Sequence, residues 1–370
     1  MRVALVHDWL DRRIGGAERV LIELAAMYPE APVYTLLHDP AMSEGRIKAE
    51  RVRTSWLQSL PAAVRRRQRY LLPLIPTAVE QFDFSGYDVV ISSSVAFTKN
   101  VLTPPQTLHV CYCHAPMRFV WDHWPAYLDE QRVGPVRATA IRLMASRLRV
   151  WDHSGVGRVD AWMANSHTTA QRIRKYYGVV APVVHPGIDV DAFAQASGSE
   201  RGDHYLTLST LTPYKRIDLA IAAFNQSGRR LIVVGDGPER ARLGALAGPT
   251  ISFAGHVGDA ERSRLLAGAR GLVFPGEEDF GIAPVEAMAS GTPVVALRRG
   301  GLTETVTEGR TGTFFDDETG AALNDAVSRL EAAPPRIADL VARARDFDVD
   351  SFRRRFREVV DAAYKNFADR

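Results

Sequence analysis

Two glutamates, Glu278 and Glu286, are separated by seven residues in the stretch GEEDFGIAPVEAMASGT, residues 276–292. The apolar segment GLVFP precedes it, and Pro284 suits the first turn of a helix, so the stretch predicts a strand, a loop and a helix. Backbone N–H groups around Gly281, at the start of that helix, would attract an anion. The two acids could serve as caps or helix-dipole partners, but carboxylates also accept hydrogen bonds from neighbouring hydroxyls. A ligand with both a phosphate and vicinal diols would use both features at once.

Basic side chains and an imidazole also lie where strands are expected to end. The segment STLTPYKRIDLAIAAF places Lys215 and Arg216 between a strand and a helix, where a cation could neutralise a diphosphate. The segment CYCHAPMR leaves an apolar strand and presents His114, which could hydrogen-bond a hydroxyl or a phosphate, or transfer a proton. The alternatives are solvent exposure for the basic pair and a structural role for the histidine.

Glycine-containing turns follow two of the predicted strands. In DRRIGGAERVLIELA, Gly15 and Gly16 precede an amphipathic helix and would let backbone N–H groups approach an anion, although a plain tight turn needs the same glycines. The segment VVGDGPER partly resembles a dinucleotide-binding fingerprint, but Arg240 stands where the third glycine belongs. We therefore interpret the turn at Gly235 as one that lines a ligand site without binding a dinucleotide.

Acid-x-acid triplets occur in IDVD, residues 188–191, and in FDVD, residues 347–350. Such triplets can hold a divalent ion against a nucleotide diphosphate. Their settings are a linker and a helix start, where aspartate is a routine capping residue. The sequence therefore predicts capping at both places, no metal site, and no cofactor apart from the substrate.

Composition limits the class of protein. A chain of 370 residues fits two domains of ordinary size, and no apolar run approaches the roughly 20 residues that span a bilayer. The start MRVALVHDWL reads as a buried strand and not as an export signal, which predicts a cytoplasmic protein. A net charge of +3 does not call for nucleic acid as a partner. The two cysteines, Cys111 and Cys113, predict neither a disulfide nor a metal site.

Short β-branched runs alternate with helical patterns along the whole chain, which predicts α/β domains with parallel sheets. A second series of the same kind begins near His204, and the stretch 178–203 between the two series is rich in Pro, Gly, Ser and Asp, like a linker. We expect two Rossmann-like, doubly wound parallel-sheet domains, 1–182 and 183–349, facing each other across a cleft. A C-terminal amphipathic helix, 350–370, is expected to pack back on the first domain.

Two basic segments could contact a membrane. Residues 51–76 combine six arginines with aromatic and leucine side chains, and residues 137–149 carry four more arginines in a helical pattern. Such segments could lie at an anionic lipid surface, here the inner face of the membrane. The alternative is a pair of ordinary amphipathic helices with solvated arginine faces.

The motif around the two glutamates, preceded by FPG and continued as AMASGTPVVA, resembles the donor site of retaining GT-B glycosyltransferases, specifically glycosyltransferase family 4. The segments HDWL, GGAERV, CYCHAPMR, PYKRID, VGDGPE and FAGHV extend this resemblance nearly end to end. The residues of HDWL, CYCHAPMR and FPGEEDFGI are most similar to those of the WbaZ-like branch. This branch comprises mannosyltransferases of bacterial surface polysaccharide assembly.

The resemblance implies roles for individual residues. Glu286 would bind the ribose hydroxyls of a nucleotide sugar, and Glu278 would contact the donor sugar near its 3- and 4-hydroxyls. Lys215 would hold the diphosphate, with Arg216 as its neighbour, and His114 of the acceptor-side domain would lie close to the reacting sugar. The other donor-binding positions are Gly16, Gly235, His256, Val257, Phe280, Gly281 and Ile282.

One position departs from the family pattern. The family usually has an arginine where this chain has Thr210, five residues before Lys215, so one of two expected diphosphate cations is missing. Arg216 or Arg298 could compensate, or the donor could bind less tightly.

The resemblance implies a metal-independent retaining hexosyltransferase, with GDP-mannose as the donor and a glycan or polyprenyl-linked saccharide as the acceptor. Electrostatic stabilisation of the departing nucleotide diphosphate would contribute most to catalysis. Two rival functions remain at this point. One is a nucleotide-sugar epimerase of the same fold, and the other is a two-domain sugar-binding protein without catalysis.

Overall fold

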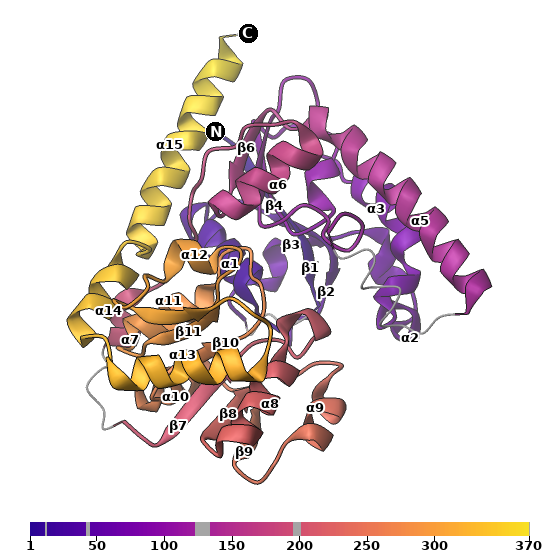
Figure 1. Cartoon of the computed structure of the whole chain (residues 1–370). Helices are drawn as coiled ribbons and strands as arrows, with labels where there is room; N and C mark the ends of the chain where they lie inside the picture. The colour runs from indigo at the N-terminus through magenta and orange to yellow at the C-terminus, as the bar shows by residue number, and fades with distance from the viewer. Residues whose placement is uncertain (12, 42–44, 123–133, 195–200, 370) are drawn as a thin grey trace. The chain divides into compact units, whose positions relative to one another are not determined.

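The structure is a computed structural model, and it describes residues 1–11, 13–41, 45–122, 134–194 and 201–369. The chain forms two compact units, and Figure 1 labels most of their helices and strands. Unit 1 comprises Met1–Val184 and Arg353–Arg370, and unit 2 comprises His185–Phe352. None of the described helices is long and apolar enough to cross a membrane.

A six-stranded parallel sheet forms the centre of unit 1, with the strand order β3-β2-β1-β4-β5-β6. The strands are β1 (Val3–Leu10), β2 (Val33–His38), β3 (Val52–Thr54), β4 (Val89–Ser94), β5 (Leu108–Cys113) and β6 (Ala161–Ala164). Every residue of β1, β4 and β5 is buried. Burial on both faces explains the near-continuous apolar runs in the sequence, and His7 and Asp8 are the charged exceptions within β1.

Helices and short turns connect these strands. The α-helices of unit 1 are α1 (Gly16–Met27), α2 (Ala62–Arg65), α3 (Ile75–Glu80), α5 (Pro135–Ser154) and α6 (His167–Tyr177). Its 3-10 turns are η1 (Ala49–Arg51), η2 (Trp56–Ser59), η3 (Gln68–Tyr70), η4 (Leu72–Leu74), η5 (Thr98–Asn100) and η6 (Gly155–Arg158). The last helix, α15 (Val349–Ala368), belongs to unit 1 from Arg353 onward. Its Phe356 ring lies 5.9 Å from the ring of Tyr112 on β5, so the end of the chain packs on the unit that contains its beginning.

Unit 2 repeats this topology. Its six parallel strands have the order β12-β11-β10-β7-β8-β9, which, read from β9, is again 3-2-1-4-5-6 within the unit. The strands are β7 (His204–Leu208), β8 (Arg230–Val234), β9 (Ile251–Gly255), β10 (Leu272–Phe274), β11 (Val294–Leu297) and β12 (Gly312–Phe315). The predicted fold class, two doubly wound α/β domains with parallel sheets, is confirmed.

The helices of unit 2 include one that the sequence did not predict. They are α7 (Val190–Ala194), α8 (Ile217–Ser227), α9 (Arg240–Leu246), α10 (Asp259–Gly268), α11 (Ile282–Ala289), α12 (Leu302–Thr305), α13 (Gly320–Ala332) and α14 (Ile337–Arg345), with a 3-10 turn, η7 (Pro213–Lys215). Helix α7 lies inside the predicted linker 178–203, part of which falls outside the described residues. Ile188, Val190 and Phe193 are buried in the core of unit 2, and their burial outweighs the turn-forming composition around them.

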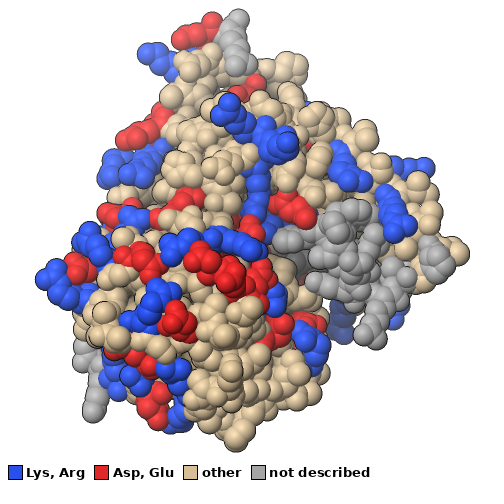
Figure 2. All heavy atoms as spheres, viewed as in Figure 1, with Lys and Arg blue, Asp and Glu red and all other residues tan. Residues whose placement is uncertain are grey.

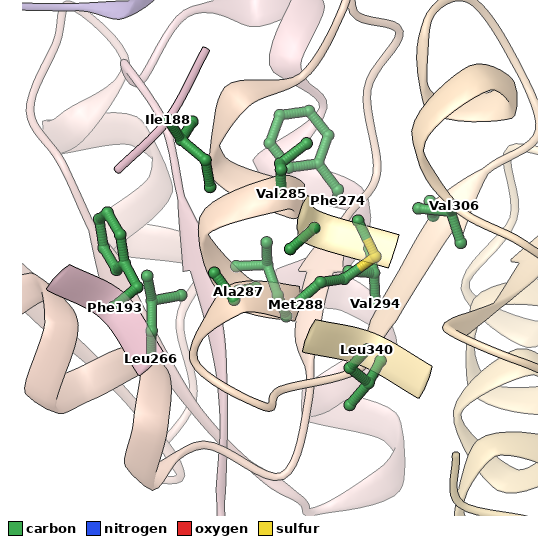
Figure 3. Packing of buried hydrophobic residues seen from close by; sticks show 14 of the residues in the cluster. Ile188, Phe193, Leu266, Phe274, Val285, Ala287, Met288, Val294, Val306 and Leu340 are labelled. Atoms are coloured by element: carbon green, nitrogen blue, oxygen red, sulfur yellow. The ribbon is translucent and has the colours of Figure 1, made fainter. Parts of the chain in front are cut away.

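Helix α11, which carries Glu286, is a core helix. Val285, Ala287 and Met288 are fully buried, and Figure 3 shows them among side chains from α7, α10 and α14. Every residue of α11 from Pro284 to Ala289 is buried, so the glutamate is held on a rigid element.

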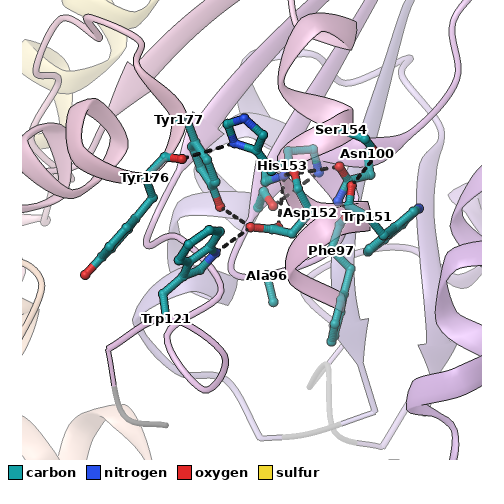
Figure 4. A network of polar contacts seen from close by, with 12 residues as sticks. Ala96, Phe97, Asn100, Trp121, Trp151, Asp152, His153, Ser154, Tyr176 and Tyr177 are labelled. Carbon is teal, nitrogen blue, oxygen red and sulfur yellow. Dashed lines mark hydrogen bonds and ion pairs between the residues drawn. The ribbon is translucent and has the colours of Figure 1, made fainter. Parts of the chain in front are cut away.

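A buried ion pair holds together three connecting elements of unit 1. The Nζ atom of Lys99 on η5 lies 3.0 Å from Oδ1 of Asp152 on α5, and their side chains are 1% and 0% exposed. The other oxygen of Asp152 accepts hydrogen bonds of 2.8 Å from the hydroxyl of Tyr177 on α6 and from Nε1 of Trp121 (Figure 4). Hydrogen bonds and an opposite charge therefore compensate the cost of burying this carboxylate.

We predict that Lys99→Met or Asp152→Ala lowers the free energy of unfolding by about 3–5 kcal/mol, because either change leaves the remaining buried charge without its partner. Urea denaturation measures the effect. The matched control is Arg230→Met, which removes an exposed ion pair with Asp203 and should leave stability nearly unchanged. Equal midpoints for Lys99→Met and this control would contradict the prediction.

Candidate functional site

In each sheet the order of strand connections reverses at one pair of strands, β7 and β10 in unit 2 and β1 and β4 in unit 1. Open α/β sheets bind ligands beyond the carboxyl ends of such pairs, because the connecting helices leave toward opposite faces and expose those ends. Most of the candidate residues follow these strands or their immediate neighbours; His256 and Val257, which follow the edge strand β9, do not.

Lys215 and Glu278 meet at the reversal point of unit 2. Lys215 ends η7, which follows β7, and Glu278 lies in the loop that follows β10. The Nζ atom of Lys215 forms an ion pair with Oε1 of Glu278, and the two side chains are 11% and 19% exposed. Nζ also lies 5.0 Å from the ring centre of Tyr214 and 5.7 Å from that of Phe274. The structure thus brings together two residues to which the sequence assigned different parts of a ligand.

Glycines fix the loop that carries Glu278. A Cβ atom on Gly276 would lie 2.8 Å from the backbone of Lys215, so only glycine permits this approach. The N–H group of Gly301 donates to the carbonyl of Glu278 at 2.8 Å, and a Cβ on Gly300 would meet that carbonyl at 2.2 Å. The roles of Gly300 and Gly301 were not predicted from the sequence. Their signal was the pair GG directly after the strand PVVAL.

The predicted helix start is present at Gly281. This glycine is the N-cap residue of α11 and has a φ of 91°, which an L residue rarely adopts, and Ile282 is the first helical residue. Phe280, also assigned to the donor site, has a buried side chain that stacks on His185 with ring centres 5.5 Å apart. A ligand contact of Phe280 would therefore come from its backbone.

Glu286 is paired with a residue that the sequence analysis missed. Its side chain is 3% exposed, and Nε of Arg262 on α10 lies 3.6 Å from its Oε2. Arg262 also pairs with Asp259, one turn earlier on the same helix. A buried carboxylate needs such a counter-charge, so Arg262 is part of the setting in which Glu286 meets a ligand. Nothing in the segment DAERSRLLAG distinguishes Arg262 from its exposed neighbour Arg264 except the tertiary fold.

The two arginines considered as substitutes for a cation at Thr210 are both engaged in ion pairs. Arg216 pairs with Glu318 and lies 3.3 Å from Asp218. Arg298 lies 2.8 Å from Glu308 and 2.9 Å from Asp316 at the surface. Arg216 is also the one described non-glycine residue with a positive φ, 52°, at the start of α8. A diphosphate would have to compete with these carboxylates for either guanidinium group.

The remaining donor-site predictions of unit 2 lie after β8 and β9. Gly235 has a φ of 127°, and a Cβ there would come within 1.9 Å of the carbonyl oxygen of Ser209, so close packing alone explains this glycine. His256 is exposed directly after β9, and Val257 is half-buried against the core of unit 2.

The aspartate triplets act as caps, as predicted. Oδ1 of Asp189 accepts the N–H of Ala192 at 3.0 Å, and Oδ1 of Asp348 accepts the N–H of Asp350 at 2.9 Å. Both bonds fall at the start of a helix, α7 and α15 respectively.

In unit 1 the candidate residues gather at the ends of β1, β4 and β5. Gly16 is the first residue of α1, and the N–H of Gly15 donates to Oε2 of Glu18 at 2.9 Å. His114 follows β5, is buried, and places Nε2 at 2.8 Å from the hydroxyl of Ser93 on β4. Burial, together with the positive charge of His7, lowers the pKa of His114 to about 3.

His7 lies in the motif HDWL, and the sequence alone predicted no role for it. His7 lies opposite Ser93 in the register of β1 and β4, and Nδ1 donates to the carbonyl of Ser93 at 2.8 Å. Nε2 of His7 is 3.7 Å from Oε1 of Glu18. Burial by itself lowers the pKa of His7, but the carboxylates of Glu18 and Asp8 and the carbonyl of Ser93 together leave the pKa raised.

Comparison with protein families agrees with this architecture. Residues 14–192 match the model of Glycosyltransferase Family 4, and residues 189–347 match the model of glycosyl transferases group 1. The chain therefore contains a Glycosyltransferase Family 4 domain followed by a glycosyl transferase group 1 domain.

Curated relatives of modest identity carry transferase names. A GDP-mannose-dependent alpha-(1-6)-phosphatidylinositol monomannoside mannosyltransferase of Mycolicibacterium smegmatis is 33% identical over 52% of this chain and 58% of its own. A D-inositol 3-phosphate glycosyltransferase of Streptomyces bingchenggensis is 31% identical over 48% of this chain and 47% of its own. The matches to these two thus span about half of each relative. The Alpha-1,3/1,6-mannosyltransferase ALG2 of Kluyveromyces lactis is 26% identical over 86% of this chain and 74% of its own.

Solved structures share the fold. Sucrose-phosphate synthase from Thermosynechococcus elongatus superimposes with a TM-score of 0.75 at 18% identity, over 99% of this chain and 100% of that one. The Anabaena protein HepE, solved with UDP and glucose, gives a TM-score of 0.68 at 18% identity, over 96% of this chain and 99% of that one. The GT-B fold expected from the sequence is confirmed.

We predict that Lys215 and Glu278 stabilise unit 2 cooperatively. In a double-mutant cycle with Lys215→Met and Glu278→Gln, the coupling in the free energy of unfolding should be on the order of 1–3 kcal/mol, because the two charges interact away from bulk water. Chemical denaturation of the four proteins measures it. The same cycle at the more exposed pair Arg216 and Glu318 is the control and should give a smaller coupling. Additive effects at Lys215 and Glu278 would show that their contact is absent in solution.

Proposed function

We propose that the protein is a retaining glycosyltransferase that moves a hexose, mannose from GDP-mannose, to a glycan or polyprenyl-linked acceptor. The observation that carries this proposal is the meeting of Lys215 and Glu278 at the reversal point of the unit 2 sheet, next to a helix N-terminus at Gly281. A cation for a diphosphate, a carboxylate for sugar hydroxyls and free amides for oxygen atoms are the chemical groups that a nucleotide sugar requires.

In the proposed reaction, negative charge develops on the leaving group and must be stabilised by the protein. As the bond between sugar and diphosphate breaks, negative charge develops on the departing phosphate, and Lys215, the amides of Gly281 and Ile282 and the amide of Gly16 stabilise it. Glu278 orients the sugar and His114 contacts it, while the acceptor hydroxyl attacks the same face and gives its proton to the departing phosphate oxygen. We propose no enzymic nucleophile and no metal ion.

The nucleotide is proposed to bind through Glu286, which accepts hydrogen bonds from the ribose hydroxyls. Its Arg262 partner places an opposite charge beside the buried carboxylate and helps to orient it. The exposed loop at His256 and Val257, with the turn at Gly235, is proposed to frame the base.

Mannose and GDP are proposed from two sources. The resemblance to the WbaZ-like branch is one, and the other is the pair of relatives named as mannosyltransferases, one of them GDP-mannose-dependent. HepE, which shares the fold, was solved with UDP and glucose, and a relative 31% identical to this chain is named a D-inositol 3-phosphate glycosyltransferase. The donor therefore needs a direct test.

We predict that GDP-mannose raises the melting temperature of the protein more than UDP-glucose does at equal concentration, because only a bound ligand shifts the folding equilibrium. Thermal-shift measurements against a panel of nucleotide sugars check this. Glu286→Gln should abolish most of the shift, and Glu304→Gln, which changes a carboxylate of unit 2 paired with His185, is the matched control. Stabilisation by UDP sugars alone would overturn the choice of donor.

Turnover separates the proposed function from its rivals. With GDP-mannose, we expect slow donor hydrolysis without acceptor, release of GDP unaffected by a chelator, and much faster release with an acceptor. Lys215→Ala should reduce turnover most, and Glu278→Ala and His114→Ala should lower turnover more than binding. An isomerised donor would indicate an epimerase, and binding without turnover under any condition would indicate a sugar-binding protein.

We further propose that unit 1 contacts anionic lipid through residues 51–76. This segment exposes Trp56, Val64 and Tyr70 beside Arg66 and Arg67. In the same unit, α5 exposes large apolar side chains at seven-residue spacing among arginines, and Figure 2 shows basic side chains on that edge of the molecule. These apolar side chains are Val136, Leu143 and Val150. Apolar anchors within a basic surface suit the headgroup region of a membrane.

We predict that the protein co-sediments with vesicles that contain anionic phospholipid and not with purely zwitterionic ones, and that salt reduces the binding. Replacing Arg66 and Arg67 by Gln should weaken binding several-fold. The matched control replaces Arg242 and Arg264, exposed arginines of unit 2, in the same way. Equal binding by the two double variants would contradict a role for residues 51–76.

A further inference from the structure

A chain of four polar side chains in unit 1, three of them buried, ends at His114. Glu18 lies on α1, His7 on β1, Ser93 on β4, and His114 directly after β5, so four separate segments contribute one residue each. His7 and Ser93 are fully buried, and the carboxylate of Glu18 is largely buried. The rings of His7 and His114 lie edge to face with centres 6.4 Å apart.

The direction of the hydrogen bonds follows from the first two members. Nδ1 of His7 lies 2.8 Å from the carbonyl oxygen of Ser93, which can only accept, so Nδ1 carries a proton. The carboxylate of Glu18 faces the other ring nitrogen at 3.7 Å and favours a proton there as well. His7 is therefore a donor at Nδ1 and cannot accept a hydrogen bond at that atom.

The hydroxyl of Ser93 must then donate to His114. Its oxygen lies 3.2 Å from the protonated Nδ1 of His7 and 2.8 Å from Nε2 of His114. Within the described part of the chain, Nε2 of His114 is the remaining acceptor for the hydroxyl proton. If Nε2 carried a proton instead, a buried hydroxyl donor would be left unsatisfied, which is costly.

We propose that Glu18, His7 and Ser93 are positioning residues that fix His114 as the neutral imidazole with its proton on Nδ1. In this form His114 donates a hydrogen bond from Nδ1 to an oxygen atom of the ligand and takes no proton from it. Nδ1 makes no hydrogen bond with any residue that the structure describes, so it is available to a ligand.

The charges around His114 support a neutral ring. His7 faces it from β1 with ring centres 6.4 Å apart, and Tyr112 from β5 with ring centres 5.1 Å apart, while Thr169 of α6 donates to its carbonyl at 3.2 Å. The carboxylate of Glu18 on α1 is the opposing negative charge. Burial and the positive charge of His7 act in the same direction, and they hold the pKa of His114 far below neutrality. Protonation of His114 would place two positive rings side by side.

The tautomer can be measured without any ligand. We expect long-range proton–nitrogen correlation spectra of the ¹⁵N-histidine-labelled protein at pH 7 to show Nδ1 protonated and Nε2 unprotonated for His114, identified by its absence in His114→Asn. Ser93→Ala should release the constraint and give a mixture of tautomers or protonation at Nε2. Ser93→Thr keeps the hydroxyl and should keep the tautomer, and Glu18→Gln should keep the tautomer while raising the pKa of His114, since His7 loses its charge.

The functional part of this inference rests on the proposed glycosyltransferase activity. With GDP-mannose, Ser93→Ala should lower kcat about tenfold with little change in KM, and Ser93→Thr should retain wild-type kcat. Protonation at Nε2 in the wild type, or an unchanged tautomer in Ser93→Ala, overturns the proposal. If the tautomer is as expected but no nucleotide sugar is bound or turned over, the positioning network stands and the proposed function fails.

Discussion

The strand order 3-2-1-4-5-6 is the constraint on which both units depend. At the middle pair of strands the connections leave for opposite faces of the sheet, and in open α/β sheets this is where ligands bind, beyond the carboxyl ends of the strands. In unit 2 this pair is β7 and β10, and Lys215 and Glu278 follow these two strands. In unit 1 it is β1 and β4, and His7 lies opposite Ser93. The polar groups of the candidate site are there because the topology leaves a place for them.

Burial then dictates that these groups come in pairs. Lys215 faces Glu278, Glu286 faces Arg262, and the carboxylate of Glu18 faces His7. A charge held away from bulk water needs a counter-charge, and each pair is drawn from two different elements or loops of the fold. A ligand group that binds one residue of such a pair replaces the partner that this residue has in the free protein. Its affinity therefore depends on the difference between two sets of contacts and not on the new contacts alone.

Much of the fold could be predicted from the sequence, because parallel strands covered on both faces produce apolar runs such as VALVHDWL. The helix start at Gly281 was also predicted, since Pro284 and the glycine specify it locally. Helix α7 was missed because its burial depends on contacts with α11 and α14, which lie about a hundred residues or more further along the chain, and its local composition is that of a linker. The predictions that agree with the structure concern features that residues close together in the sequence determine.

The site residues that were missed share one physical reason. Arg262 is part of the site because it pairs with Glu286, and Gly301 because its N–H group donates to the carbonyl of Glu278. In both cases the partner lies on another element or loop. His7 sits inside an apolar strand, where a histidine reads as a core residue until its partners are known. Sequence patterns indicate interactions between residues that are close in the sequence. These residues interact with partners that are distant in the sequence and close only in the fold.

Asp8, next to His7, is a buried acid whose hydrogen bonds leave it unavailable to a substrate. Its two oxygens accept four backbone N–H groups, those of Val95, Ala96, Phe97 and Thr98, at 2.5–3.1 Å. A carboxylate with this many donors has no lone pair left for a substrate proton, and the turn after β4 depends on it as a template. Asp8 therefore acts on His7 as a nearby negative charge. It is not a candidate for accepting a proton from a substrate.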